Sequence, residues 1–144
     1  MTVIAAGHEF VDRAAEALYS EALLLSDETR AYFDGEGKAE RDRLGPAARV
    51  QFACESLKAT TRLLQVIAWL AGRRRPGEQP AKAIAESAAS GPEVLGALPS
   101  PARRLILAGI DLHGRCERLA DGTDTVVAAD SPARSLLQRL ERSI

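Results

Sequence analysis

Two side chains that could do chemistry lie three residues apart on one predicted helix. His113 and Cys116 share a helical face, so an imidazole and a thiolate could bind one metal ion or line a small-ligand pocket. The chain contains only two His and two Cys, which are too few for a zinc site built from those types alone. Both residues lie on or beside an apolar stripe, which favours packing in the core. We expect no metal and no cofactor, and an enzyme or ligand-binding pocket near His113 and Cys116 is the alternative.

A second group of polar side chains follows one face of an earlier helix. Its members recur at spacings of three and four residues: Glu55, Lys58, Arg62, Gln65 and Trp69. One interpretation is a solvated face whose ion pairs each contribute under ~0.5 kcal/mol. In the other, the face meets a further helix or a partner protein, and Trp69 is either an interface anchor or a core residue. These five residues form a candidate interaction face, and its structural, dimeric or partner-binding role stays open.

The composition limits the class of protein. Of 144 residues, 46% are hydrophobic and 27% are charged, with a net charge of −1. These values exclude a fully disordered chain and disfavour binding of nucleic acid over a broad basic face. Aromatic residues make up only 4%, so the core must be aliphatic. No GxGxxG, Walker-type, CxxC, HExxH or GxSxG motif is present, and we predict a protein without catalytic residues that is not an enzyme.

Two further expectations concern the compartment. The N-terminus lacks the features of a signal sequence, and no apolar stretch approaches the ~20 residues of a membrane-spanning helix. We therefore predict a cytoplasmic protein that does not bind membranes. In that compartment Cys54 and Cys116 are expected to be thiols.

Three long segments carry apolar residues at helical spacing. The helices that they predict must position the candidate residues described in the first two paragraphs. They span about residues 8–34, 47–75 and 100–121. The first stripe comprises Ala15, Leu18, Ala22, Leu25, Thr29 and Tyr32. The second segment has one stripe of Val50, Ala53, Leu57, Thr60, Leu64, Ile67 and Ala71 and another of Phe52, Ala59, Leu63, Val66 and Leu70. The third stripe comprises Ala102, Leu105, Gly109, Leu112, Cys116 and Leu119.

So wide an apolar arc on the second helix predicts contact with two neighbours, or with one neighbour and a second subunit. We place Leu64 in the core, where truncation to Ala should cost about 2–5 kcal/mol.

The remaining segments read as connections. Residues 35–46 are a polar connector that ends at Pro46, where a helix can begin. Residues 76–101 hold five of the seven prolines and form a long linker, in which residues 81–89 could form a short helix. Ser100 is the expected N-cap of the third long helix, and a last short helix spans about 131–142. The predicted fold is all-α: a single domain, 1–144, built as an antiparallel three-helix bundle with a Pro-rich linker and a short C-terminal helix.

The candidate interaction face lies within a run that resembles a known family. The segment ESLKATTRLLQVIAWLAGRRR, which starts at Glu55, resembles the signature helix of the DUF1465 family, the RcdA-like (regulator of CtrA degradation) proteins of alphaproteobacteria. Residues 18–44 are similar to that family's first helix and connector, and LPSPARRLILAGIDLHGRCERLAD is similar to its third helix. The terminal SPARSLLQRLERSI resembles its tail segment, although the tail here is short. Residues 76–97 lie outside the resemblance.

The resemblance implies a homodimeric three-helix bundle with a non-enzymatic adaptor role. Such adaptors act in cell-cycle-regulated proteolysis and deliver substrates such as CtrA to the ClpXP protease. Besides this adaptor and the ligand-binding alternative, a structural interaction protein unrelated to proteolysis is a third interpretation.

Overall fold

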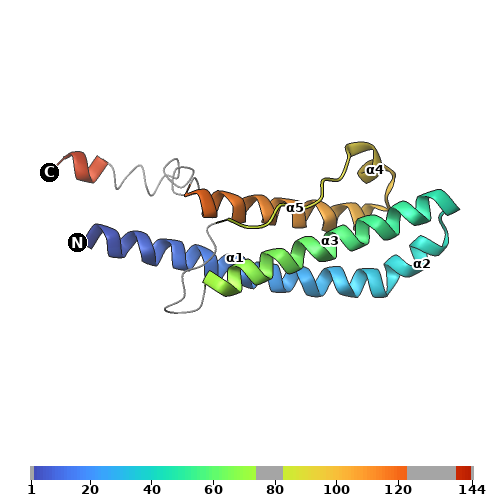
Figure 1. The fold of residues 1–144 in the computed structure, drawn as a ribbon, viewed down its shortest axis with the longest axis horizontal. Helices are drawn as coiled ribbons and strands as arrows, with labels where there is room; N and C mark the ends of the chain where they lie inside the picture. Colours follow the sequence, from blue (N-terminus) through green and yellow to red (C-terminus); the bar gives the residue numbers. More distant parts are fainter. Residues whose placement is uncertain (1, 74–82, 123–138, 144) are drawn as a thin grey trace.

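The structure, a computed structural model, describes residues 2–73, 83–122 and 139–143 of the chain. In these ranges all regular secondary structure is helical. The elements in chain order are α1 (Thr2–Asp34), α2 (Glu36–Asp42), α3 (Pro46–Arg73), α4 (Pro92–Ala97) and α5 (Ser100–Asp121). The three long helices α1, α3 and α5 pack on one another (Figure 1), which confirms the predicted three-helix bundle.

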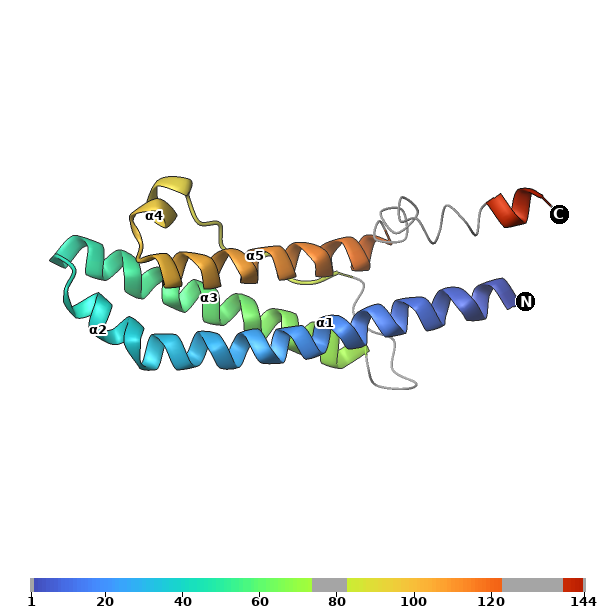
Figure 2. The same cartoon turned by 180° about the vertical axis from the view of Figure 1, so that it is seen from behind.

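The relative directions of the long helices depend on the course of the linker between α3 and α5. α1 runs antiparallel to both α3 and α5, whereas α3 and α5 run in the same direction (Figure 1). Residues 83–91 carry the chain back along the bundle from the end of α3 toward its start, where α4 and then α5 begin. Figure 2 gives the opposite view, in which α1 lies in front. The long linker is therefore a return connection that lets two consecutive long helices lie parallel.

The corner after α1 differs from the predicted polar connector. Glu36–Asp42 form α2, a helix of 7 residues that is separated from α1 by the single residue Gly35. Gly37 is buried against Tyr32, and a Cβ atom there would lie 2.8 Å from the Tyr32 carbonyl oxygen and 2.9 Å from its ring. Only glycine fits such an approach. The corner brings Glu40 to the Tyr32 hydroxyl, which donates a hydrogen bond to the Glu40 carboxylate.

The linker also differs from its prediction. Residues 83–91 form no helix, so the short helix expected at 81–89 is wrong for its described part, and residues 81 and 82 lie outside the described residues. The helix in this region is instead α4, with Pro92 in its first turn. Contacts with α3 and α5 override the helical preference of the Ala-rich segment, because they occupy its carbonyl oxygens.

The helix ends can be compared with the expected bounds. α3 begins at Pro46, and α5 ends at Asp121 before Gly122, whose φ of 74° closes the helix in the left-handed conformation. Ser100 is the first residue of α5 rather than its N-cap, a position held by Pro99. α1 begins at Thr2, earlier than expected. Residues 74, 75 and 131–138 lie outside the described residues, and residues 139–142 are helical.

The core is mainly aliphatic, but it also includes the aromatic residues Tyr32, Phe52 and Trp69. The predicted stripes of α1 and α5 are buried or half-buried along their length. One cluster joins α1, α3 and α5 with the linker: Ala15, Leu18, Ala22, Leu63, Val66, Trp69, Leu70, Ile84, Leu112, Cys116 and Leu119. A second cluster lies toward α2 and α4: Tyr32, Phe52, Ala59, Leu95, Leu98, Ala102, Leu105 and Ile106. Within the described residues, no helix has the length and hydropathy needed to cross a membrane.

Candidate functional site

The most elaborate polar site of the described residues is where residues 83–91, here called the strap, lie against α3 and α5. The surface of these helices that contacts the strap, with Glu55, Lys58, Arg62, Gln65 and His113, is here called the groove. The strap runs antiparallel to α3, so its later residues meet earlier positions of the helix. Side chains of α3 and α5 hold carbonyl oxygens of the strap by four hydrogen bonds: Lys58 Nζ to Ala89 (3.1 Å), Arg62 Nη2 to Ala88 (2.9 Å), Gln65 Nε2 to Glu86 (3.3 Å) and His113 Nε2 to Ala85 (2.9 Å). These side chains bind the strap through its backbone.

The spacing of these bonds matches the geometry of the two chains. From Lys58 to Gln65 an α-helix rises by roughly 10 Å, at ~1.5 Å per residue. Their partners, Ala89 and Glu86, are three residues apart, which an extended chain spans in about 10 Å at ~3.3 Å per residue. The helix therefore presents donors at the interval at which an extended peptide presents acceptors.

Two charged residues lie at the centre of the groove. Arg62 is 1% exposed and Glu55 is 3% exposed. Glu55 accepts hydrogen bonds from the Ser90 hydroxyl and from Lys58 Nζ at 3.0 Å, and Arg62 Nε donates to Ser87 Oγ at 3.3 Å. Burial lowers the pKa of Arg62 from its ordinary value, and the negative charge of Glu55 opposes that shift. Buried charges need such partners, so strap and groove depend on each other.

The candidate interaction face of Glu55, Lys58, Arg62, Gln65 and Trp69 is thus covered by the chain itself. The strap bonds to all of its polar members. Trp69 lies in the core cluster, with the guanidinium of Arg73 4.7 Å from its ring centroid. In this conformation the polar members of the face hold the strap.

His113 and Cys116 are both buried in contacts with the rest of the chain. His113 is buried and its Nδ1 lies 2.8 Å from Glu117 Oε1, while Nε2 faces the strap. Cys116 is fully buried in the aliphatic cluster, and it and the exposed Cys54 are thiols. No group of three or more His, Cys, Asp or Glu side chains among the described residues is placed to hold a metal ion.

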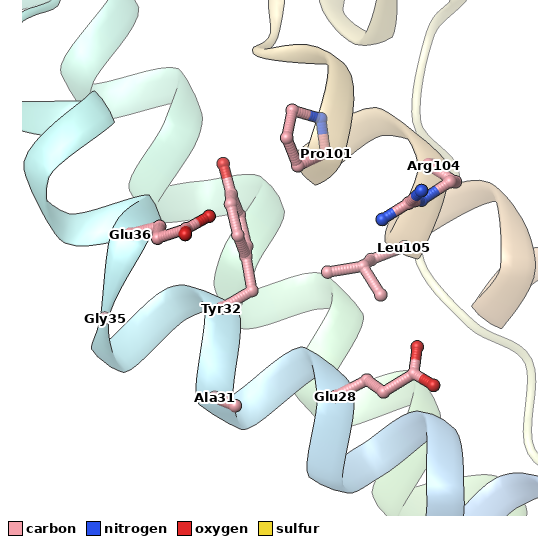
Figure 3. A pocket seen from close by; sticks show the side chains of 8 residues that line it. All are labelled: Glu28, Ala31, Tyr32, Gly35, Glu36, Pro101, Arg104 and Leu105. Carbon is pink, nitrogen blue, oxygen red and sulfur yellow. The ribbon is translucent and has the colours of Figure 1, made fainter.

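An open cleft of about 530 Å³ lies elsewhere, between α1, the start of α2 and the first turns of α5. Figure 3 shows Tyr32 and Arg104 on opposite sides of this cleft, with Glu28 and Glu36 along its α1 and α2 side. Burial and the hydrogen bond to Glu40 raise the pKa of Tyr32 above its ordinary value. The Tyr32 hydroxyl therefore stays protonated at physiological pH and acts as a hydrogen-bond donor.

Leu64 was expected in the core, and this assignment is wrong, because it lies with Val50 and Leu57 on an exposed side of α3. The side chains of Val50, Leu57 and Leu64 are 64%, 68% and 62% exposed. At about 100° per residue they lie on the side of α3 opposite to Phe52, Leu63 and Leu70, so the helix cannot bury both sets in one bundle. The buried set is the one that also turns Glu55 and Arg62 toward the strap.

Sequence reasoning missed the strap and its anchor, Ile84, which packs in the core cluster. A signal was present in the charged residues: Glu55, Lys58 and Arg62 lie beside the buried stripe of a central helix, where charges need partners. The small residues from Ala85 to Ser90 could have suggested a segment that passes close to a helix.

The comparisons with known proteins agree with this description. The family described as "Protein of unknown function (DUF1465)" matches residues 7–144 of the chain. The solved structure of RcdA from Caulobacter crescentus CB15 is similar, with 32% sequence identity and a TM-score of 0.58. That similarity covers 73% of this chain and 86% of the other. No curated protein sequence matches the chain.

Proposed function

Because the chain belongs to the DUF1465 family, we propose that it is a non-enzymatic, cytoplasmic adaptor in regulated proteolysis that resembles RcdA. In this role it delivers client proteins such as CtrA to the ClpXP protease during the cell cycle. Such work needs surfaces that meet other proteins. The observation that carries the proposal is the exposed apolar face of α3.

That face is unusual for the outside of a helix. Between Val50 and Ala68 the only charged residues of α3 are Glu55, Lys58 and Arg62, and all of them lie on the strap side. The other exposed residues of this span are uncharged, and all but Gln51 are small: Gln51, Ala53, Cys54, Thr60, Thr61 and Ala68. Exposed, contiguous apolar surface of this kind marks a protein–protein interaction site.

We propose a second copy of the chain as the occupant of this face. Val50, Leu57 and Leu64 repeat every seven residues, which is the spacing of helices that pack lengthwise. A two-fold axis at Leu57 would pair Val50 of one copy with Leu64 of the other, so the stripe is self-complementary. The face therefore fits the homodimer that the family resemblance implies.

Changing Leu57 to Glu is expected to convert the dimer into a monomer, because it places a charge at the centre of the apolar stripe. Multi-angle light scattering at micromolar concentration measures the mass. Leu107→Glu on α5, at another exposed leucine, is the matched control and should leave the dimer intact. A wild-type chain that is strictly monomeric at these concentrations would contradict the dimer.

Delivery itself is tested with purified components. We expect the chain to bind ClpX, alone or with a protease-priming response regulator, and to increase the rate at which ClpXP degrades CtrA. Degradation is followed by gel electrophoresis with and without the chain. A dimeric chain that neither binds ClpX nor changes the degradation rate of CtrA would overturn the adaptor role.

A further inference from the structure

The groove between α3 and α5 is built like a peptide-binding site. Its four side-chain donors bind carbonyl oxygens, which every peptide presents. Among the backbone hydrogen bonds of the described residues, none joins the strap to α3 or α5; Gly91 alone accepts one, from Leu95 N at the start of α4. The strap is therefore held as an extended ligand is held, by side chains of the groove that bind its main chain.

The strap fills this groove with a simple pattern. Ile84 is buried among aliphatic residues of α3 and α5, and it acts as the anchor. The residues that follow, from Ala85 to Ser90, are small except for Glu86, which is exposed. The pattern is one large aliphatic side chain followed by an extended run of small residues.

The strap leaves part of the groove unsatisfied. Gln65 Oε1 and Arg62 Nη1 are buried and have no hydrogen-bond partner. Buried polar atoms in folded proteins are normally hydrogen-bonded, so each such atom needs an explanation. Gln65 Oε1 can accept a peptide N–H and Arg62 Nη1 can donate to a further carbonyl. A segment with a slightly different course would satisfy both.

We propose that the α3/α5 groove binds an extended peptide segment of a client protein, and that the strap is an internal occupant which this segment displaces. The segment has the strap's chemistry, a large aliphatic residue followed by small residues. The inference rests on the proposed adaptor function, for which it names the class of partner. Because the strap is tethered, it competes at high effective concentration and lowers the apparent affinity of the intact chain.

The experiment uses the full-length chain and a fluorescent synthetic peptide that carries residues 83–90 (AIAESAAS). Fluorescence anisotropy measures its binding to the wild-type chain and to Ile84→Ser, in which the strap's own anchor is removed. We expect the peptide to bind at least tenfold more tightly to Ile84→Ser than to the wild-type chain. A gain on this order is expected when a tethered competitor no longer occupies the site. Ile84→Ala keeps an apolar side chain and serves as a second, milder variant, with a gain of about threefold. Circular dichroism establishes which variants are folded.

The matched controls test whether the peptide occupies the groove. In the Ile84→Ser or Ile84→Ala chain, adding Gln65→Leu should weaken binding about fivefold, because it removes one hydrogen bond. Gln51→Leu makes the same change at an exposed position of α3 and should leave the affinity unchanged. Absence of binding to every folded variant, or binding that Gln65→Leu does not weaken, would overturn the proposal.

This assay contains no protease, so the two proposals fail separately. Peptide binding without any effect on CtrA degradation would overturn the adaptor role, and the proposal that the groove binds a peptide would still hold. Accelerated degradation of CtrA by a chain that does not bind the peptide would overturn the proposal that the groove binds a peptide, and the adaptor role would still hold.

Discussion

Replacing Arg62 with Ala is expected to lower the free energy of unfolding by about 3–5 kcal/mol, a range typical of breaking a buried, hydrogen-bonded charge network. The side chain is 1% exposed and donates to Ala88 O and Ser87 Oγ of the strap. Its removal leaves that carbonyl oxygen without its donor and takes one positive charge from beside the buried Glu55. Urea denaturation followed by circular dichroism measures the change.

Arg13→Ala is the matched control for this variant, because Arg13 is exposed on α1. Its effect should stay within about 0.5 kcal/mol. The sequence alone allowed two outcomes for Arg62→Ala: nearly intact folding if the face serves partners, or unfolding if the residue belongs to a buried network. A loss below about 1 kcal/mol would show that the strap is not held by Arg62 in solution.

The second large effect is expected from Leu70→Ala, which should destabilise the chain by about 2–5 kcal/mol. Leu70 is fully buried in the aliphatic cluster between α1, α3 and α5. Its truncation removes apolar contacts and leaves a cavity in a core that has little room to collapse. Chemical denaturation again gives the free energy of unfolding.

The control for Leu70→Ala is the same change at Leu64, on the opposite side of the same helix. Leu64 is largely exposed, so its truncation should cost less than about 1 kcal/mol when the chain is monomeric. A dimer would add the free energy of association, so both variants are compared at concentrations where light scattering shows a monomer. If Leu64→Ala cost more than Leu70→Ala, the orientation of α3 described here would be wrong and Leu64 would belong to the core as first expected.

The long helices were predictable because each carries a periodic apolar stripe. On α1 and α5 one stripe stands out, and the structure buries it. α3 carries apolar residues on two opposite sides, so periodicity identifies the helix but not its orientation in the bundle. The orientation depends on where Glu55 and Arg62 find partners. Those partners are the Ser90 hydroxyl for Glu55, and the Ala88 carbonyl oxygen and the Ser87 hydroxyl for Arg62. They lie more than twenty residues away along the chain, which no local pattern reveals.

The strap was unpredictable for a related reason. An alanine-rich segment between prolines has a helical preference. The signal that its carbonyl oxygens are bound elsewhere lies mainly on α3, in charged residues beside a buried stripe. The spacing of Glu55, Lys58, Arg62, Gln65 and Trp69 placed them on one side of a helix. The segment that covers these residues is set by tertiary contacts, and the spacing of residues in the sequence does not indicate such contacts.

The strap's mode of attachment has a consequence for how this chain can diverge. Carbonyl oxygens are the same in every amino acid, so a groove that binds them places few demands on the exposed side chains passing through it. Substitutions at Ala85 or Ala88 should therefore accumulate freely among relatives. An insertion is a different matter, because one added residue between Glu86 and Ala89 would shift the carbonyls by about 3 Å relative to the donors of α3. Selection on this segment should preserve its length more strictly than its composition.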